Sequence, residues 1–450
     1  MTVRLLSCLL LPALLTTAAA WAEESPVRLK PAPAHRTAVS GWLDQRLPEL
    51  VDAYKHLHAH PELSLQELKT ATFIARALEQ AGWEVTRGVG RTGVVAVMKN
   101  GTGPTVLIRG DMDALPVLEE TGLPYASKVQ VKNPDGTTVG AMHACGHDVH
   151  STMLVGLAPL LADLKDQWKG TVLLVAQPAE EVGKGAKAMI DDGLFERFPK
   201  PDYCLSLHVK HNLPVGAVGY TSGFAMANVD SVDITIYGKG GHGARPHDTV
   251  DPIVTAAHVI TALQTIVSRR VNPVEPAVVT VGSIKGGTKH NIIPDEVKLQ
   301  LTVRSYSDEV RKQLLDSIRQ ITIDTCKTFG CPKTPDVSID ETQFTPASYN
   351  DPALTRAAME LFTDHLGKEN IVEFPAEMGG EDFGRFAKHL GVPGLQYRIG
   401  TQPRDKYEAS LKPGADPLPS LHSPLFHPDP EPTVRLAVES MANLAMSLLQ

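Results

Sequence analysis

The chain has 450 residues, of which 42% are hydrophobic and 21% charged, and its 43 Lys and Arg against 51 Asp and Glu give a formal net charge of -8. This profile is typical of a globular protein of about two or three domains, and it excludes a disordered chain or a small scaffold. The acidic balance also lacks the basic field that nucleic-acid-binding proteins usually carry, so we expect no nucleic-acid partner.

Residues 1–22 have the pattern of an export signal. Arg4 precedes an apolar run from Leu5 to Leu15, and small residues flank Trp21 where a signal peptidase reads. The run is shorter than a membrane-spanning helix, which needs about 20 residues. We therefore expect cleavage after Ala22 and a periplasmic or secreted protein with no membrane partner after cleavage. Cys8 comes before most of the apolar run, which disfavours lipidation at that residue.

The next segment, residues 23–40, begins with a Pro-rich stretch and is predicted to be a linker. From Trp42 onward, helical periodicity alternates with short apolar runs bounded by glycine, which is the rhythm of an α/β sheet. Residues 41–226 and 343–450 are predicted to form the two parts of one α/β catalytic domain. The strand candidates are VVAVMK, TVLIRG, TVLLVAQ, YCLSLHV and GLQYRIG, and helices are expected over 147–164 and 433–449.

Residues 227–342 have a different pattern and are predicted to form an inserted domain. The alternating run VDSVDITIYG is followed by a helix over 252–269, the strands AVVTVGSI and VKLQLTVRSY, and a helix over 308–329. A strand near Val337 would complete a β-α-β-β-α-β unit, which is the ferredoxin-like arrangement. Because sheet-forming segments resume on both sides, the two flanking parts are expected to close one sheet around the insertion.

Metal-competent side chains gather where predicted strands leave the sheet. The carboxyl ends of strands in open α/β sheets meet at one edge, where ligands bind, so these side chains are expected to converge there. Taken singly, a cysteine can be a small buried hydrophobe, paired acids a solvated loop, and a histidine a satisfied core residue. Their coincidence favours a metal-dependent hydrolase. The side chains are Asp111 and Asp113 after TVLIRG, Cys145 and His147 in MHACGHD, Glu180 and Glu181 after TVLLVAQ, and His208 in YCLSLHV.

Spacing constrains two of these pairs. Residues two apart on a helix do not face each other, so Cys145 and His147 converge only if their turn is still loop, with the helix starting just after it. Consecutive side chains diverge, so one member of the pair Glu180 and Glu181 can bind a metal while the other acts as a general base. A thiolate together with imidazoles suits zinc.

The motifs resemble those of the M20 metallopeptidase and amidohydrolase family, in particular its hippurate hydrolase and auxin-conjugate hydrolase branch. The resemblance runs from about Asp52 to the C-terminus, and it implies a mixed-sheet catalytic domain sandwiched by helices, with the inserted domain as a lid that forms a homodimer. The motifs that carry it are HLHAHPELSLQE, RGDMDALPV, MHACGHDVHSTML, AQPAEEVGKGAKAMIDDG, GKGGHGARPHDTVDPI, HNIIPDEVKLQLTVRS, MGGEDFGRF and LHSPLFHPD.

The resemblance also implies a centre of two divalent metal ions per subunit, zinc or manganese first, with cobalt or nickel as further possibilities. Cys145 would bridge the two metals, His147 and His208 would complete the shell of one, and Glu181 and His422 would hold the other. By its own surroundings His422 has the pattern of a surface loop histidine, and only the order of motifs assigns it to the site.

Further roles follow from the same resemblance. Glu180 would be the general base, and Asp113 would support the ligands from behind. His242, between glycines in the inserted domain, would stabilise an oxyanion in the partner's site. Asn291 and Arg304 would contact the free carboxylate of a small-molecule substrate, a task for which the planar fork of Arg304 is suited.

The activity expected from these residues is hydrolysis of the amide bond of N-acyl amino acids to a carboxylic acid and a free amino acid. A carboxypeptidase or dipeptidase is the alternative within the same chemistry, and a non-catalytic dimeric metal- or amino-acid-binding protein is the alternative from another class. Retention of Glu180 disfavours the latter, because binding alone needs no base. Cys204 is expected to be core packing, and a disulfide between Cys326 and Cys331 stays open.

Overall fold

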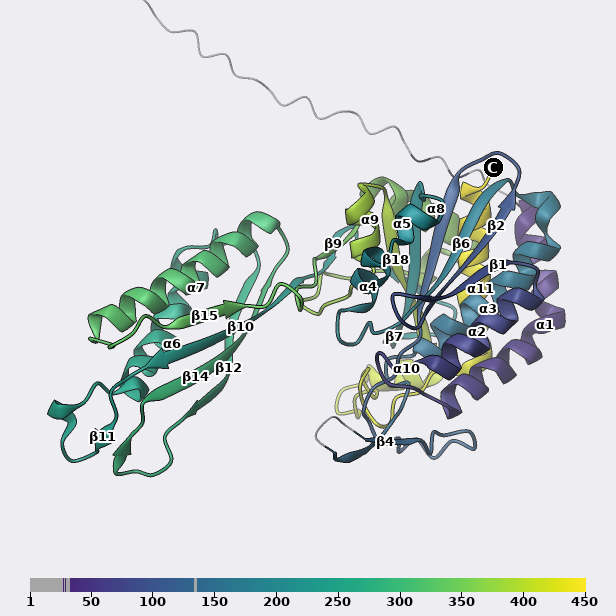
Figure 1. Cartoon of the computed structure of the whole chain (residues 1–450). Helices are drawn as coiled ribbons and strands as arrows, with labels where there is room; N and C mark the ends of the chain where they lie inside the picture. Colours follow the sequence, from purple (N-terminus) through teal and green to yellow (C-terminus); the bar gives the residue numbers. More distant parts are fainter. Residues whose placement is uncertain (1–26, 28, 30–32, 133–135) are drawn as a thin grey trace, which may run out of the picture.

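The computed structural model describes residues 27, 29, 33–132 and 136–450 (Figure 1). The export signal predicted for residues 1–22 and its cleavage site lie outside the described residues. No helix within the described ranges combines the length and the apolar character that a membrane span requires.

The larger sheet is mixed and, within the described residues, has eight strands in the order β1-β2-β6-β3-β7-β18-β8-β17. Strands β6, β3, β7 and β18 run parallel to one another, and β1 and β2 pair antiparallel with their neighbours. Strand β8 pairs antiparallel with β18 and parallel with β17. The five strands predicted from the sequence are confirmed, and the short β1, β8 and β17 were missed. The bounds are β1 (Glu84–Val89), β2 (Gly93–Asn100), β3 (Thr105–Asp111), β6 (Gly170–Gln177), β7 (Tyr203–Pro214), β8 (Val218–Tyr220), β17 (Ile371–Glu373) and β18 (Gly394–Gln402).

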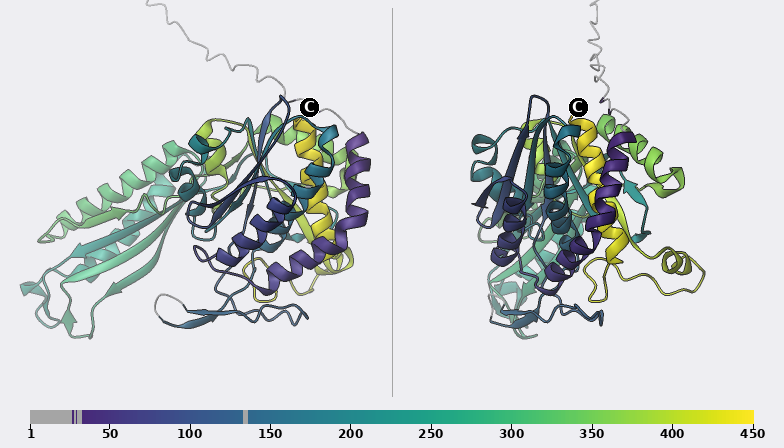
Figure 2. Two further views of the ribbon diagram at one scale, coloured as in Figure 1. Left: turned by 45° about the vertical axis from the view of Figure 1, so that its right-hand side comes forward. Right: turned by 90° about the vertical axis from the view of Figure 1, so that its right-hand side faces the viewer.

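Helices cover both faces of this sheet (Figure 2). In β2, Val94 and Ala96 belong to the core beneath the first group of helices, whereas Val95 and Val97 belong to the core on the other face. The first group is α1 (Pro33–Ala59), α2 (Leu68–Gln80), α3 (His147–Asp163), α8 (Pro352–Leu366) and α11 (Pro430–Leu448), and the second is α4 (Gly185–Asp191), α5 (Leu194–Arg197) and α9 (Gly384–Leu390).

The linker predicted for residues 23–40 is wrong over residues 33–40, which form the first turns of α1. Val39 is fully buried in the main core, so this part of the segment packs onto the catalytic domain. Helices α3 and α11 agree with their predicted ranges to within three residues at either end. The shorter elements are η1 (Lys165–Gln167), η3 (Lys368–Asn370), α10 (Arg404–Ser410), β4 (Gln130–Lys132), β5 (Thr138–Gly140), β9 (Gly223–Met226) and β16 (Ser348–Asn350).

A second sheet forms the inserted domain, with strands in the order β12-β14-β10-β15, all antiparallel. This is the ferredoxin-like arrangement, and the strand expected near Val337 is β15. Helices α6 and α7 pack on one face of the sheet and share its apolar core. The elements are β10 (Asn228–Tyr237), β11 (Gly241–His242), η2 (Pro246–Asp248), α6 (Pro252–Arg269), β12 (Ala277–Gly286), β13 (Ile292–Ile293), β14 (Glu296–Ser305), α7 (Asp308–Thr328) and β15 (Asp336–Ile339).

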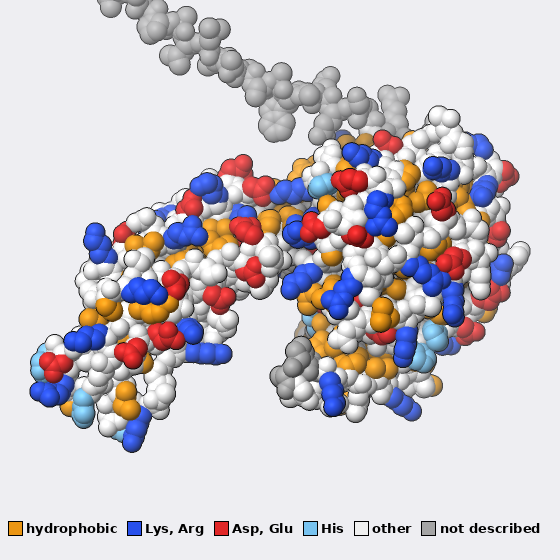
Figure 3. Space-filling view, viewed as in Figure 1, with side chains coloured by type: hydrophobic (Ala, Val, Ile, Leu, Met, Phe, Trp, Pro, Cys, Tyr) orange, Lys and Arg blue, Asp and Glu red, His pale blue; other side chains and the backbone are white. Residues whose placement is uncertain are grey.

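The chain returns to the first sheet after the insertion. Strand β18 pairs in parallel with β7, so that Gly394 lies beside Cys204, and β16 pairs with β9 at the junction. The two domains form separate lobes with an open recess between them (Figure 3). Cys204 is fully buried in the core, and Cys326 and Cys331 are free thiols.

A buried ion pair network fixes the start of α3. The imidazole of His58, near the end of α1, lies 2.7 Å from Oδ2 of Asp148 and 3.0 Å from Oε1 of Glu119. Burial opposes protonation of this imidazole, but the hydrogen bonds with the two carboxylates outweigh it and raise the pKa of His58 to about 9. His58 therefore carries a positive charge in the folded protein at neutral pH.

We expect His58→Ala to lower the free energy of unfolding by about 3 kcal/mol near neutral pH, because Asp148 and Glu119 would stay buried without their cation. The raised pKa stabilises the folded state fully below the ordinary value of 6.5, and this contribution is lost as pH rises through about 9. Urea unfolding at about pH 6.5 and about pH 10 measures both effects. The exposed His60→Ala is the control, with an expected change below about 0.5 kcal/mol; equal losses in the two variants would contradict the assignment.

Candidate metal centre

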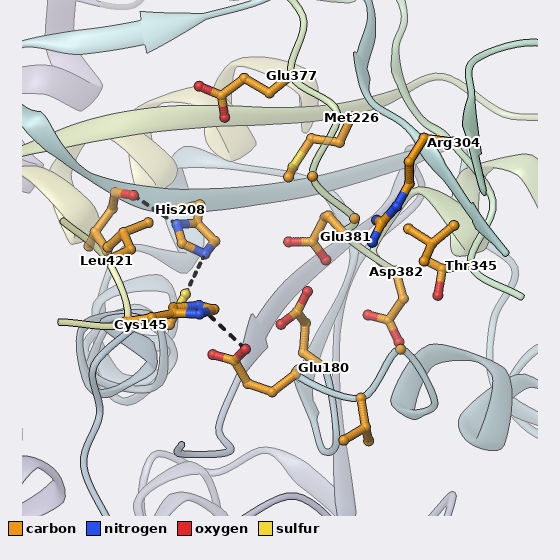
Figure 4. A pocket seen from close by; sticks show the side chains of 18 of the residues that line it. Cys145, Glu180, His208, Met226, Arg304, Thr345, Glu377, Glu381, Asp382 and Leu421 are labelled. Carbon is orange, nitrogen blue, oxygen red and sulfur yellow. Dashed lines mark hydrogen bonds and ion pairs between the residues drawn. The ribbon is translucent and has the colours of Figure 1, made fainter. Parts of the chain in front are cut away.

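A cavity of about 520 Å³ lies between the carboxyl edge of the larger sheet and the inserted domain. Cys145, His208 and Glu180 line one side of it, and Arg304 from β14 lines the other (Figure 4). The sequence-predicted residues Glu181 and His422 also lie in its wall.

A tight turn at Gly146 brings Cys145 and His147 together. Gly146 has φ 77°, and a Cβ at this position would lie 2.4 Å from Cγ2 of Val209, so both its backbone conformation and its surroundings require glycine. The helix predicted over 147–164 is α3, and His147 is its first residue, while Cys145 lies in the preceding turn. Cys145 Sγ lies 3.5 Å from Nε2 of His208.

Backbone carbonyls hold the two imidazoles in one orientation. Nδ1 of His147 lies 2.8 Å from the carbonyl oxygen of Asp113, and Nδ1 of His208 lies 2.8 Å from that of Val209. Because a carbonyl can only accept, both Nδ1 atoms donate, which leaves Nε2 of each ring as the nitrogen that can bind a metal. Both Nε2 atoms are therefore available as metal ligands. His208 lies within β7 rather than at its end, contrary to the sequence-based placement.

Glu181 and His422 complete a second group around Cys145. Nε2 of His422 lies 3.5 Å from Oε2 of Glu181, while Nε2 of His147 lies 3.8 Å from Oε1 of the same carboxylate. The loop that carries His422 has φ 67° at this residue and is tied by its N–H to the carbonyl of Ala144 at 2.9 Å. A strained backbone at a site residue is typical of functional loops.

The donor set fits a metal. Nε2 of His147, Oε1 of Glu181 and Oδ1 of Asp113 are buried and have no hydrogen-bond partner among the described residues. Two groups of side chains each have ligand atoms that lie within 4.8 Å of one another. The first is Cys145, His147 and His208, and the second is Cys145, Glu181 and His422, so the two groups share the thiol of Cys145. Buried polar atoms without partners are costly unless an ion or water binds them.

Electrostatics indicates the same conclusion. Burial and the nearby Glu181 raise the pKa of the Cys145 thiol well above its ordinary value. Burial, with repulsion from Glu381 and Glu181, raises the pKa of Glu180 well above its ordinary value, and burial raises that of Glu181 to about 7. Anionic donors are thus disfavoured here without a cation, and a bound metal ion would reverse this.

Two further clusters of possible metal ligands near the cavity are already bound to other protein groups. His150 donates from Nδ1 to Asp111 at 2.5 Å and accepts from the N–H of Val209 at Nε2, so neither nitrogen is free to bind a metal. Glu381 and Asp382, near Glu180, bind the guanidinium of Arg109. The sequence reasoning missed Arg109, although an arginine inside the apolar run TVLIRG was a signal.

Asp113 lies behind the cavity, as expected. Its Oδ2 accepts hydrogen bonds from Ser64 Oγ at 2.6 Å and from the N–H of Glu181 at 3.0 Å. These bonds, together with His147, hold the pKa of Asp113 below its ordinary value in spite of burial. Asp113 is therefore ionised, and it holds His147 and Glu181 in position.

The structure does not bring His242 or Asn291 to the cavity of this chain. Both lie at the far tip of the inserted domain, where β11 pairs with β13 and the N–H of Gly243 donates to the carbonyl of Asn291 at 2.8 Å (Figure 1). The side chain of His242 is exposed, and its Nδ1 accepts from the N–H of Ala244.

Comparisons with known proteins agree with the fold. Residues 107–413 match peptidase family M20/M25/M40. The N-acetyl-L-cysteine deacetylase of Bacillus subtilis is 39% identical over 78% of this chain and 80% of its own, and the IAA-amino acid hydrolase ILR1-like 4 of Arabidopsis thaliana is 37% identical over 85% and 82%. The crystal structure of Bacillus subtilis YXEP, described as a dinuclear metal-binding peptidase from the M20 family, has a TM-score of 0.73 at 32% identity and covers 90% of this chain and 99% of its own.

We expect Cys145→Ala to lower the metal affinity at least about tenfold, because loss of even an outer partner of a ligand costs this much. Metal analysis after gel filtration in metal-free buffer measures the effect. Cys204→Ala is the matched control, since Cys204 is equally buried but lies in the core away from the cavity. Equal metal content in both variants would refute the assignment of Cys145.

Proposed function

We propose that this chain, which belongs to peptidase family M20/M25/M40 and is a metal-dependent hydrolase, cleaves the amide bond of N-acyl amino acids to a carboxylic acid and a free amino acid. The observation that carries the proposal is one cavity that combines two ligand groups sharing Cys145, the carboxylate of Glu180 beside them, and Arg304 opposite. A base beside metal ligands suits hydrolysis, and a guanidinium facing them suits a substrate with a free carboxylate.

The centre is proposed to hold two divalent metal ions. Cys145, His147 and His208 would bind one, and Cys145 with Glu181 and His422 the other. Bound metals of this kind polarise a carbonyl and acidify water. The thiolate and imidazoles suit zinc; manganese is the next choice, with cobalt or nickel as further possibilities.

Glu180 is proposed to be the general base. Its side chain is 10% exposed, its carboxylate oxygen lies 4.0 Å from Nε2 of His147, and it faces the cavity (Figure 4). Glu180 would take a proton from the attacking water and return it to the leaving nitrogen, which must be protonated to depart as an amine. Asp113, from behind, would keep His147 and the backbone of Glu181 in place.

Arg304 is proposed to bind the free carboxylate of the substrate. Its Nε donates to Thr302 Oγ1 at 3.0 Å, and its Nη1 lies near Gly380, where a Cβ would come within 3.8 Å of it. The guanidinium thus keeps donors directed at the cavity, and a planar fork of donors matches a carboxylate.

We further propose a homodimer formed through the inserted domain. Ile253 and Val254 on α6, Ile284 on β12 and Ile292 on β13 are exposed apolar side chains of this domain, and β12 is a sheet edge. Apolar side chains together with an unpaired strand edge favour association with another chain. In such a dimer His242, with Asn291 nearby, would reach the partner's cavity and stabilise the oxyanion. The signal-like N-terminus supports a periplasmic or secreted location.

Glu180→Gln should retain metal but lower kcat by about 10²- to 10⁴-fold, because the amide keeps the shape of the side chain without accepting the proton. Steady-state kinetics with a panel of N-acyl amino acids and dipeptides, together with metal analysis of the same samples, tests this. Turnover of dipeptides alone would assign the chain to dipeptidases instead. Full activity of the variant would remove Glu180 from the mechanism.

Mixing Glu180→Gln and His242→Ala subunits tests the contribution across the dimer. Each mixed dimer would contain one site with both Glu180 and His242, so random exchange should restore about a quarter of wild-type activity. The two inactive parents measured alone are the controls. An absence of rescue in verified mixed dimers would show that His242 acts within its own chain or not at all.

A further inference from the structure

The charges that line the cavity are unevenly paired. Lys210 donates to Glu377 at 2.5 Å, and Glu381 and Asp382 share the buried Arg109 behind the wall. Glu181 is one of the proposed metal donors, so each of these charged groups has a partner of opposite charge. The exceptions in the wall are two guanidinium groups, those of Arg304 and Arg398.

Neither guanidinium has a carboxylate partner within 4.0 Å among the described residues. Arg398 donates from Nη2 to Sδ of Met226 at 3.0 Å, and a thioether is a weak acceptor. The carboxylate next to Arg304, that of Asp230, is bound by Arg311 at 2.6 Å. Two incompletely satisfied guanidinium groups therefore line one cavity, and a planar fork of this kind matches a carboxylate.

Strand register places Arg398 next to the metal ligands. Arg398 on β18 lies directly beside His208 on β7, and the two strands are parallel. Side chains of paired residues in neighbouring strands leave the same face of a sheet, so Arg398 and His208 both face the cavity. The lining of the same cavity contains Arg398, His208 and Glu377.

The two guanidinium groups belong to different walls. Arg304 comes from the inserted domain, whereas Arg398 comes from the larger sheet. Gly379 and Gly380 lie between the two guanidinium groups. A Cβ on Gly379 would lie 2.7 Å from Cε of Met226, to whose sulfur Arg398 donates, and a Cβ on Gly380 would lie 3.8 Å from Nη1 of Arg304. A carboxylate bound by Arg304 therefore leaves Arg398 without a carboxylate within 4.0 Å among the described residues, since Glu377 is paired with Lys210.

We propose that Arg398 forms a second anion subsite, so that the preferred substrates are N-acyl amino acids with two carboxylates. The second carboxylate belongs either to an acidic amino acid or to a dicarboxylic acyl group, and Arg398 binds it through charge-assisted hydrogen bonds. This inference rests on the proposed function for the amide cleavage and on Arg304 for the first carboxylate. It assigns specificity to Arg398 and no part in bond breaking.

The test compares substrates of matched shape with the metal-loaded enzyme. N-acetylglutamate against N-acetylglutamine, and N-succinylalanine against N-butyrylalanine, differ mainly in the second carboxylate and identify which side of the amide carries it. We expect the wild type to favour one dianionic member at least about tenfold in kcat/KM, and Arg398→Met to abolish that preference. The monoanionic substrates, N-acetylglutamine and N-butyrylalanine, should be cleaved equally by wild type and variant, which shows that the variant is folded.

Arg304→Met is the matched comparison, because it should raise KM for dianionic and monoanionic substrates alike. Two kinetic outcomes would overturn the inference: no preference in the wild type, or an equal loss for all substrates in Arg398→Met. In both cases cleavage of acyl amino acids, and with it the proposed function, would stand.

A binding measurement separates failure of the inference from failure of the proposed function. Calorimetry with glutarate and with butyrate on the metal-loaded protein needs no turnover. Tighter binding of glutarate that is lost in Arg398→Met would support the second subsite even if no acyl amino acid were cleaved. Equal binding of the two acids, or a difference that persists in the variant, would refute it.

Discussion

The buried guanidinium of Arg109 connects the parts of the chain that form the site. It is fully buried and binds Asp111 at 2.6 Å on its own strand and Glu381 at 2.8 Å from the segment after the insertion. Burying one cation among carboxylates is favourable only when nearly every donor is satisfied, so this cluster constrains where the returning chain can lie. Asp111 in turn holds His150, whose Nε2 accepts from the backbone of β7.

The same cluster explains why the side of the cavity around Glu180 favours cations. Arg109 alone cannot neutralise Glu381, Asp382 and Glu180, and burial with repulsion from Glu381 and Glu181 holds the pKa of Glu180 well above its ordinary value. Burial keeps solvent from screening this repulsion. Metal ions at the neighbouring donors would relieve this repulsion. The edge of the sheet therefore carries an excess of negative charge that bound cations would neutralise.

Much of this arrangement follows from local sequence. Apolar runs of β-branched residues predicted the central strands, and the helix predicted over 147–164 agrees with α3 at its first residue and differs by one at its last. Two kinds of feature escaped. The first turns of α1 were taken for linker, because prolines there suggested an extended chain while burial of Val39 decides its packing. His422 and Arg398 come from loops and strands far along the chain, and only the pairing of β18 with β7 and the loop geometry bring them to Cys145.

If both guanidinium groups bind substrate as proposed, selectivity depends on the distance between the two domains. The metal donors and Arg398 belong to the larger sheet, while Arg304 belongs to the inserted domain, which contacts the first domain through a narrow junction at β9 and β16. The ion pair between Lys388 and Asp308 at 2.8 Å crosses the same junction. Because hinges absorb backbone change at a few residues, a substrate that binds both guanidinium groups would fix the domains relative to each other. Substrate length, and not charge alone, would then determine whether the amide carbon reaches the donors around Cys145.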